Sequence, residues 1–393
     1  ARDAPGVGRP GDGRICVHRF APRGLLGDVN AFFKALPVCL FLLLTARVQA
    51  APPVAPKPGT TRSVSGPSDA ERYARRCQSQ TAQRIARPQG TMLWGTKRSW
   101  DPEKPSDERT SVLVSVALDA PRQAEAGVKA LRFEGGRLWA VPAPETGATA
   151  SDVVGTVLQG TASDGKPVEV AICGAEPAAD DPGRVFYRIE AWNAVAREWE
   201  NPCVALDRSP APRALAVGGV WDASGAHADA PDRVTFACEN GAISKCILWG
   251  YAPWASRDGQ SLAGLHQACT RLARADYCGN GRSHTRQDTT IDIYDRMGVL
   301  ERATEVTREW DPAKGSFEAA WAPDGATCLS RTRDGRALDL ILQECPGRFQ
   351  ADTGNAGEAS ESCTVRRGDV KPGAALLRNL SYGPPKADPA PVR

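Results

Sequence analysis

Apolar and polar residues alternate along much of the first half of the chain, with the two-residue period of strands that bury one face. Two pairs of these segments are joined by short turns, Glu134-Gly135-Gly136-Arg137 and Ser163-Asp164-Gly165-Lys166. Glycine supplies the positive φ angles that tight hairpin turns need. The pattern therefore predicts two β-hairpins within an antiparallel sheet. The predicted strands of this half cover residues 111–118, 131–133, 138–141, 153–161, 168–173 and 185–192.

One segment after residue 250 repeats its apolar residues with the period of a helix. Leu262, Leu265 and Cys269 share one face, and Ser261 just before them is a typical N-cap residue. The segment Gly279-Asn280-Gly281 follows, and its glycines favour the left-handed conformation that ends many helices. The sequence therefore predicts a helix over about residues 261–276.

Three further short strands are predicted in the second half, at residues 289–294, 317–321 and 338–342. Strand signals thus outnumber helical ones along the whole chain. We expect an α+β fold that is mostly antiparallel β, has one principal helix at about residues 261–276, and is held together by disulfides.

An apolar run near the beginning predicts a signal peptide. The run covers residues 35–46, follows Lys34 and ends at Val48-Gln49-Ala50, which suits signal peptidase. It is shorter than the about 20 residues of a membrane-spanning helix. We expect residues 1–50 to be an upstream segment and signal peptide, cut after Ala50, and the mature protein to be secreted or periplasmic. No transmembrane segment is expected after this cut.

Removing this leader changes the charge balance. The whole chain has 49 Lys and Arg against 46 Asp and Glu, and residues 1–50 hold seven of the basic and three of the acidic residues. The remainder therefore has 42 basic and 43 acidic residues, a net charge of −1. Because nucleic-acid binding needs a basic surface, we expect no nucleic-acid partner.

The cysteine count after residue 50 is even, and in an exported protein this predicts disulfides. A zinc site is the alternative, but no two cysteines have the C-x2-C spacing, and His227, His266 and His284 are far apart in sequence. We expect no metal and no cofactor. The spacing leaves the pairing of the cysteines open. The ten expected half-cystines are Cys77, Cys173, Cys203, Cys238, Cys246, Cys269, Cys278, Cys328, Cys345 and Cys363.

Composition divides the chain into segments. Residues 51–90 form a predicted linker that begins rich in Pro, Ser and Thr, and residues 347–393 a predicted flexible tail of Gly, Ala, Pro and charged residues. Between them we expect a β-rich part at 91–222 and a cysteine-rich core at 223–346. The tail contains Asn379-Leu380-Ser381, which is formally a glycosylation sequon.

The familiar motifs of nucleotide binding and hydrolysis are not supported. Gly160 to Lys166 has the spacing of a phosphate-binding loop, but Pro167 replaces the hydroxyl residue that would bind Mg²⁺. The sequence contains no G-x-S-x-G and no H-E-x-x-H motif. Since catalytic triads need not be local in sequence, this does not exclude a hydrolase.

Acidic and histidine side chains gather around the predicted helix. His284 and Asp276 are the first candidates for a base and an acid, with His266 as a third, and Asp292 and Asp295 add possible ligands. The alternative is structural: Asp276 caps the turn or pairs with Arg274 or Arg282, and His266 lies at a helix edge.

Three aromatic residues, Trp249, Tyr251 and Trp254, lie within six positions of one another. Flat rings can cover the face of a sugar, so these residues are candidates for glycan binding. Aromatic clusters are more often part of a core, and the sequence alone leaves both interpretations open.

The segment from Cys269 to Gly279 resembles the signature of the ADYC domain, a family named for four residues that match Ala275-Asp276-Tyr277-Cys278. This chain departs from the family pattern at Leu248, where the family has Arg, and near Gln287, where the family has a Gly-type turn. The resemblance covers roughly residues 90–346. Its other matches include Leu158-Gln159-Gly160-Thr161, Phe236-Ala237-Cys238, Trp249-Gly250-Tyr251, His284-Thr285 and Ile291-Asp292-Ile293-Tyr294-Asp295.

The resemblance implies a secreted bacterial protein, of a kind frequent in myxobacteria, from a family without an established reaction. The leader, the even number of cysteines, the linker and the absence of hydrolase motifs favour a binding or interaction module at the cell surface or outside the cell, with a cell-wall or extracellular glycan as the expected partner. The alternative is a secreted hydrolase acting on polysaccharide or peptide through His284 and Asp276. Whether the protein is an enzyme stays open at this point.

Overall fold

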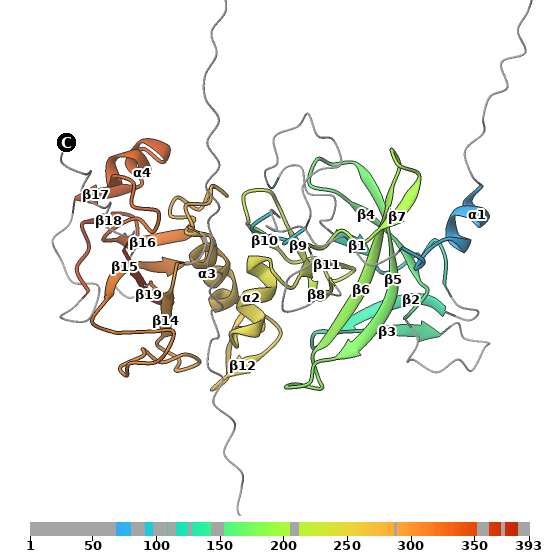
Figure 1. Cartoon of the computed structure of the whole chain (residues 1–393), viewed down its shortest axis with the longest axis horizontal. Coiled ribbons are helices and arrows are strands. Elements are labelled where there is room, and N and C mark those ends of the chain that lie inside the picture. Colours follow the sequence, from blue (N-terminus) through green and yellow to red (C-terminus); the bar gives the residue numbers. More distant parts are fainter. Residues whose placement is uncertain are drawn as a thin grey trace, which may run out of the picture.

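The computed structural model describes residues 68–79, 91–96, 108, 115–124, 128–142, 153–204, 212–286, 289–351, 361–370 and 374–383. The predicted leader at 1–50 and most of the predicted linker at 51–90 lie outside these residues. Two lobes built on β-sheets stand side by side, with helices α2 (Ala242–Leu248) and α3 (Ala263–Arg274) between them (Figure 1). We call residues 115–238 the barrel lobe and residues 263–382 the C-terminal lobe.

A seven-stranded antiparallel sheet forms the barrel lobe, in the order β5-β4-β1-β11-β8-β6-β7. Because β5 also pairs with β6, six of these strands close into a barrel, and β7 is added outside it. The strands are β1 (Ser115–Ala117), β4 (Val157–Thr161), β5 (Pro167–Pro177), β6 (Val185–Asn193), β7 (Glu198–Glu200), β8 (Ala214–Gly218) and β11 (Arg233–Cys238).

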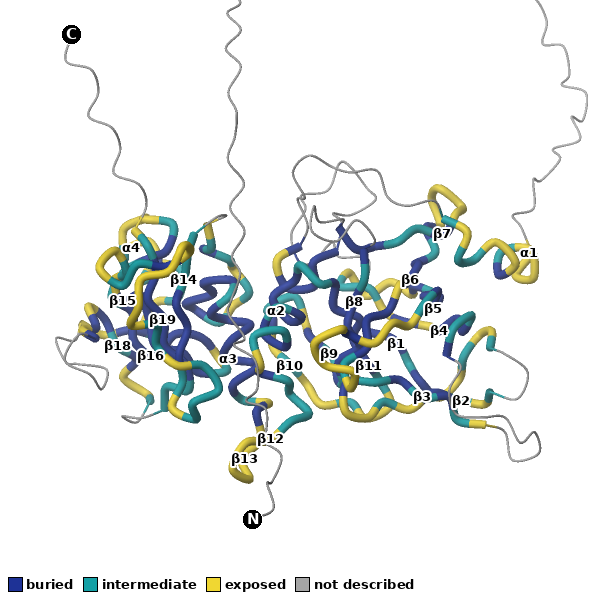
Figure 2. The backbone as a smooth tube through the Cα atoms, turned by 60° about the horizontal axis from the view of Figure 1, so that its bottom comes forward, coloured by how far each residue is buried: buried dark blue, intermediate teal, exposed yellow. Residues whose placement is uncertain are grey.

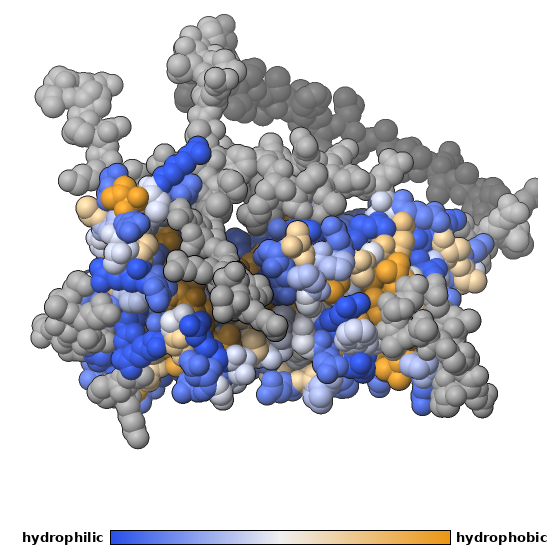
Figure 3. Space-filling view, turned by 90° about the horizontal axis from the view of Figure 1, so that it is seen from below, coloured by the Kyte–Doolittle hydropathy of each residue, from blue (hydrophilic) through white to orange (hydrophobic). Residues whose placement is uncertain are grey.

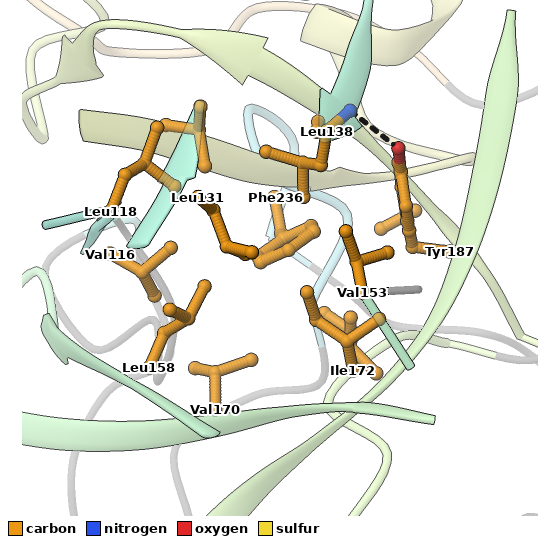
Figure 4. Close-up of a cluster of buried hydrophobic side chains, with 14 of the residues drawn as sticks. Val116, Leu118, Leu131, Leu138, Val153, Leu158, Val170, Ile172, Tyr187 and Phe236 are labelled. Atoms are coloured by element: carbon orange, nitrogen blue, oxygen red, sulfur yellow. Dashed lines mark hydrogen bonds between the residues drawn. The ribbon is translucent and has the colours of Figure 1, made fainter. Parts of the chain in front are cut away.

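Alternate residues of these strands point inward and fill the barrel, as the two-residue period requires. Val116, Leu158, Val170 and Phe236 come from four different strands and meet in its interior (Figure 4). Tyr187 joins them, and its hydroxyl accepts a hydrogen bond of 2.8 Å from the backbone N–H of Leu138. The barrel is therefore a packed core rather than an open channel.

The hairpin of β2 (Val128–Glu134) and β3 (Arg137–Pro142) adds Leu131 and Leu138 to this core. Its turn has φ values of +58° at Gly135 and +83° at Gly136, the two left-handed residues expected of a tight hairpin. Both predicted hairpins are thus confirmed, the second being β4–β5. A small ladder of β9 (Val220–Trp221) with β10 (His227–Ala228) completes this lobe. A second one, β12 (Ser256–Arg257) with β13 (Gln260–Ser261), lies between α2 and α3.

The C-terminal lobe is a six-stranded antiparallel sheet in the order β14-β19-β15-β16-β18-β17. Helix α3 packs on it through β15 and β16. Its core contains Leu272, Tyr277 and Trp321. In both lobes the buried segments lie inside and many of the turns are exposed (Figure 2). The strands are β14 (Ile291–Asp295), β15 (Gly315–Ala322), β16 (Gly325–Leu329), β17 (Phe349–Ala351), β18 (Val365–Arg367) and β19 (Leu377–Tyr382).

The expectation of one principal helix is not confirmed, since the described residues contain four helices. Besides α2 and α3 there are α1 (Asp69–Ala74) and α4 (Leu338–Glu344). Helix α4 occupies the segment predicted as a strand at 338–342, so that prediction is wrong. Its buried Ile341 and the flanking Leu338 and Leu342 have helical spacing, which a short apolar run does not distinguish from a strand.

The predicted ends of α3 also shift. The N-cap is Leu262, and the Ser261 hydroxyl accepts a hydrogen bond from the N–H of Ala263 instead of capping the first turn. The helix ends at Ala275, whose φ of +51° is left-handed, before the glycines that were expected to end it. The helix closes there because the Ala275 N–H bonds to the Leu272 carbonyl and the Asp276 N–H to the Arg271 carbonyl, as in a left-handed helix end.

Parts of the predicted linker and tail belong to the fold. Helix α1 lies inside the predicted linker, and β17, β18 and β19 lie inside the predicted flexible tail, which is wrong for these three strands. Strand β19 runs between β14 and β15 and buries Leu377. Long-range pairing orders these segments, and their local composition gave no sign of it. Strand β11, placed after the predicted boundary at 222, is central in the barrel sheet.

All ten cysteines expected to pair do so, in five disulfides. Two are in or join the barrel lobe, Cys77–Cys173 and Cys203–Cys238, and Cys246–Cys269 joins α2 to α3. The C-terminal lobe holds Cys278–Cys345 and Cys328–Cys363. Five disulfides suggest an oxidising compartment, extracellular or periplasmic. Within the described ranges, no helix has the length and apolar character needed to cross a bilayer.

The sequon at Asn379 lies within β19. Asn379 is fully buried, and its side-chain oxygen accepts a hydrogen bond of 2.8 Å from the Trp321 indole N–H. Its side chain is therefore a core contact in the folded protein and is not accessible for glycan attachment.

Candidate functional site

Asp276 lies directly after α3 and organises the turn that leaves it. Its carboxylate accepts hydrogen bonds from Arg271 Nη1 at 2.7 Å and from the backbone N–H groups of Asn280 at 3.1 Å and Gly281 at 3.0 Å. Arg274 Nη1 lies 3.6 Å away, and the Asp276 side chain is fully buried. This is the expected chemistry of a structural carboxylate, satisfied by guanidinium and backbone donors.

Tyr277 connects α3 to the sheet of the C-terminal lobe. Its ring stacks between His284, at 5.7 Å between centroids, and Trp321, at 5.4 Å. Its hydroxyl accepts from the backbone N–H of Arg333 at 2.7 Å and donates to Glu318 at 3.2 Å. Burial raises the pKa of Tyr277 well above its ordinary value, so the phenol stays protonated.

A buried ion pair of Glu318 and Arg333 lies at the hydroxyl end of Tyr277, and no sequence pattern predicted it. Arg333 donates to Glu318 from Nη2 at 2.8 Å and from Nε at 3.0 Å. It also donates to the carbonyls of Leu272 at 2.9 Å and Ala273 at 3.2 Å, in the last turn of α3. One guanidinium group thus caps the C-terminal end of α3 and also neutralises the Glu318 carboxylate.

Each residue from Ala275 to Cys278 therefore has a distinct structural role. Ala275 ends the helix, Asp276 closes the turn, Tyr277 fills the core, and Cys278 binds Cys345 at the end of α4. The four-residue motif is the joint between α3 and the sheet.

His284 does not pair with Asp276. Its Nε2 lies 2.9 Å from Glu344, and its Nδ1 lies 3.9 Å from Asp334. The side chain is 1% exposed, with the Tyr277 ring on one face. The candidate acid and base of the sequence thus belong to different hydrogen-bond sets, and neither reaches the surface.

His266 joins α3 to α2. Its Nε2 lies 3.0 Å from the Ile243 carbonyl, so this nitrogen carries the proton, and its ring meets Trp221 edge to face. Burial lowers its pKa to about 4. His266 is therefore a neutral core residue at ordinary pH.

Two other acidic candidates, Asp292 and Asp295, also lie in the C-terminal lobe. The Asp295 carboxylate accepts from the Tyr251 hydroxyl at 2.9 Å and from the N–H groups of Met297 and Leu300. Asp292 accepts from the N–H of Ala303, and burial raises its pKa to about 6. The first is a turn residue, and the second is a carboxylate in an unfavourable site.

The three aromatic candidates have different surroundings. Tyr251 is fully buried, and Trp249 is half-buried against the core of the C-terminal lobe. Trp254 meets the edge of Phe133 at 5.9 Å, and a Cβ at Gly136 would lie 2.4 Å from its ring. The glycine turn of the β2–β3 hairpin thus packs closely against Trp254 and fixes its position.

Trp254 lines a cavity of about 240 Å³ at the side of the barrel lobe. The β2–β3 turn, the loop between β5 and β6, α2 and the segment after it supply its walls. Two charged residues of the β5–β6 loop, Asp181 and Arg184, line it. They lie in the turn-like segment Asp180-Asp181-Pro182-Gly183-Arg184, which was not among the predicted site residues. The lining residues are Gly135, Asp181, Gly183, Arg184, Ile247, Ala252 and Trp254.

Some polar groups of this cavity are already hydrogen-bonded within the protein. Arg184 Nη2 donates to Asp180 at 2.6 Å, and Asp181 Oδ1 accepts from the N–H of Gly183 at 3.0 Å. Arg184 Nε has no acceptor among the residues that the structure describes. Because this nitrogen is itself enclosed by protein atoms, it is not a donor that a ligand in the cavity can reach.

A comparison with family models matches residues 150–335 to the ADYC domain. The matched range contains most of the barrel lobe, α2, α3 and the sheet up to β16. Searches of curated proteins and of solved structures each gave no significant match.

Proposed function

We propose, from the premise that residues 150–335 of this chain form an ADYC domain, that the protein is an exported binding module for a cell-wall or extracellular glycan. The observation that carries the proposal is the cavity at Trp254. A tryptophan ring offers a flat apolar surface to one face of a sugar, and adjacent polar groups bind its hydroxyls.

The size and chemistry of the cavity fit one sugar unit. Its volume of about 240 Å³ is below the range of about 300–1,000 Å³ that drug-sized ligands need. Asp181 supplies acceptor oxygens and Arg184 supplies donors, which together match a neutral, hydroxyl-rich ring. The outer face seen in Figure 3 is largely hydrophilic with small apolar patches, which suits a soluble protein that binds a polar ligand.

Export is supported by the disulfides. Ten cysteines in five pairs are typical of proteins that fold outside the reducing cytosol. The apolar run at residues 35–46 is of the length and kind that direct export.

A hydrolase using His284 and Asp276 has less support. Asp276 has its charge and lone pairs satisfied by Arg271 and backbone N–H groups, and His284 is buried against Tyr277. A general acid or base has to come within hydrogen-bond reach of the substrate. Both side chains would need a rearrangement of the turn after α3 before a substrate could reach them.

The test is binding of the mature protein to a panel of neutral glycans, measured by glycan array and then by calorimetry. Trp254→Ala is expected to weaken binding at least tenfold, about 1.4 kcal/mol, and Trp254→Phe less. Trp249→Ala is the matched control, since Trp249 is also a half-buried tryptophan but does not line the cavity. Binding that resists Trp254→Ala, or that Trp249→Ala weakens equally, would contradict the proposal.

A further inference from the structure

The outer face of the β2–β3 hairpin carries a second cluster with no part in the core. Arg132 lies directly opposite Trp139 across the two strands, and Glu134 lies opposite Arg137. The inner face of the same hairpin holds Leu131 and Leu138 in the barrel core. Because side chains alternate between the faces of a strand, Arg132, Arg137 and Trp139 project away from the barrel.

Two guanidinium groups converge on the Trp139 ring. Arg137 Cζ lies 4.3 Å from the ring centroid, and Arg132 Cζ lies 5.4 Å from it. A cation over an indole ring is attracted by the ring's negative face. Trp139 thus holds close together two like charges that would otherwise repel each other.

The cluster has more positive than negative charge. Arg132 pairs with Glu134, and both are exposed, at 51% and 68% of their side-chain surface. The Arg137 side chain makes no hydrogen bond or ion pair with any residue in the described part of the chain. Its planar group therefore offers several donors in the fork geometry that binds carboxylate, sulfate or phosphate.

The face does not have the character of an apolar docking surface. The exposed large apolar side chains of the described residues are Met92, Val195, Val306 and Leu340, and none is in this hairpin. A hydrophobic partner or a lipid bilayer would need such an anchor. The charges favour an anionic, soluble ligand.

We propose that the face formed by Arg132, Arg137 and Trp139 binds the carboxylate groups of an acidic polysaccharide. Arg137 is the principal contact, Arg132 the second, and Trp139 orients both. This surface is on the opposite face of the hairpin from Phe133, which touches Trp254, although the turn of the hairpin lines the cavity through Gly135. The proposal therefore does not depend on neutral sugar binding at Trp254.

The experiment uses the mature protein and three polymers: alginate, a uronic-acid polysaccharide; dextran, a neutral one; and double-stranded DNA, a phosphate polyanion. Affinity electrophoresis and calorimetry are run at low and at physiological salt. The protein is expected to bind alginate in preference to dextran and DNA, and to lose affinity as salt increases, since exposed charges are screened.

The double variant Arg132→Gln with Arg137→Gln is expected to weaken alginate binding at least tenfold. The matched control is Arg257→Gln with Arg308→Gln, which removes the same charge from two other exposed arginines and is expected to change binding less than twofold. Arg137→Lys keeps the charge without the fork and is expected to fall between them. Circular dichroism and the melting temperature check that each variant is folded.

Three results would overturn the proposal. Unchanged binding in the folded double variant would remove the site. Equal losses in both double variants would leave only a general charge effect. Tighter binding to DNA than to alginate at equal salt would show that the ligand is not a polysaccharide. The variant Asp181→Asn, which changes the cavity at the β5–β6 loop, should leave alginate binding intact, so the two proposals fail independently.

Discussion

Arg333 and Glu318 form a buried, bidentate ion pair, with Nη2 2.8 Å from Oε1 and Nε 3.0 Å from Oε2. The side chains are 1% and 0% exposed. Because Arg333 also caps α3, this pair joins the helix to β15 through one guanidinium. The C-terminal lobe therefore depends on an electrostatic contact as well as on its apolar core.

Glu318→Gln is expected to lower the free energy of unfolding by about 3–5 kcal/mol, because it leaves the Arg333 charge buried without its counterion. Urea denaturation followed by circular dichroism measures this. The control is Asp164→Asn, which removes the partner of Lys166, itself 67% exposed, and should cost less than about 1 kcal/mol. Equal, small losses would mean that the buried pair does not stabilise the lobe.

Asp276→Asn is expected to destabilise the protein by about 3 kcal/mol or more, since it removes the charge that pairs with buried Arg271. The thermal midpoint should fall, while binding of glycans to the folded fraction should not change. Loss of polysaccharide or peptide hydrolysis in an equally stable Asp276→Asn variant would instead support a catalytic carboxylate.

His266 makes stability depend on pH. Its pKa is lowered from 6.5 to about 4 in the folded protein, so the unfolded chain binds the proton more readily. Its contribution is complete above pH 6.5 and is lost as the pH falls toward 4, by about 3 kcal/mol in total. His266→Gln keeps a donor for the Ile243 carbonyl and should flatten this part of the stability curve. An unchanged slope would show that the imidazole is not buried in neutral form.

Asp292 makes stability depend on pH in the opposite direction to His266. Its pKa is raised from 3.8 to about 6 by burial, so the folded protein binds the proton more readily than the unfolded chain. Its stabilising contribution is complete below pH 3.8 and is lost as the pH rises through 6. Asp292→Asn should therefore raise the melting temperature at pH 7 and leave it nearly unchanged at pH 4. A lower melting temperature at pH 7 would contradict this assignment.

The disulfides predict a simple thiol count. Mature, denatured protein without reductant should show no reactive thiol, and ten after reduction. Peptide mapping should recover the pairs 77–173, 203–238, 246–269, 278–345 and 328–363. Replacing Cys246 and Cys269 together by Ala should cost about 3 kcal/mol. Ten free thiols in a well-folded protein would exclude the cross-linked fold.

Short-range signals predicted the fold best. Glycine turns located both hairpins of the barrel lobe, and the helical period located α3, because turn chemistry and periodicity are read within a few residues. The same signals failed at Leu338 to Leu342, where a short apolar run suits either element, and at β19, whose order comes from pairing with β14 and β15.

The surroundings of the candidate residues could not be predicted in this way. The carboxylate that meets His284 is 60 residues away at Glu344, and no spacing rule connects them. The pairing of Arg333 with Glu318 could not be predicted from the sequence for the same reason. Trp254 was a candidate from its sequence neighbours, but the cavity that sets it apart from Trp249 depends on a loop about seventy residues upstream.

The Cys77–Cys173 bond determines how the molecule responds to force. It fastens the segment after α1 to β5, at the end of the barrel lobe far from the C-terminal lobe (Figure 1). Tension applied upstream of α1 would reach this covalent bond and spread through the closed barrel. When the opposing force acts on the barrel lobe, the joint at Tyr277 and the sheet beyond it lie off this route, so the C-terminal lobe stays unloaded while the barrel is pulled.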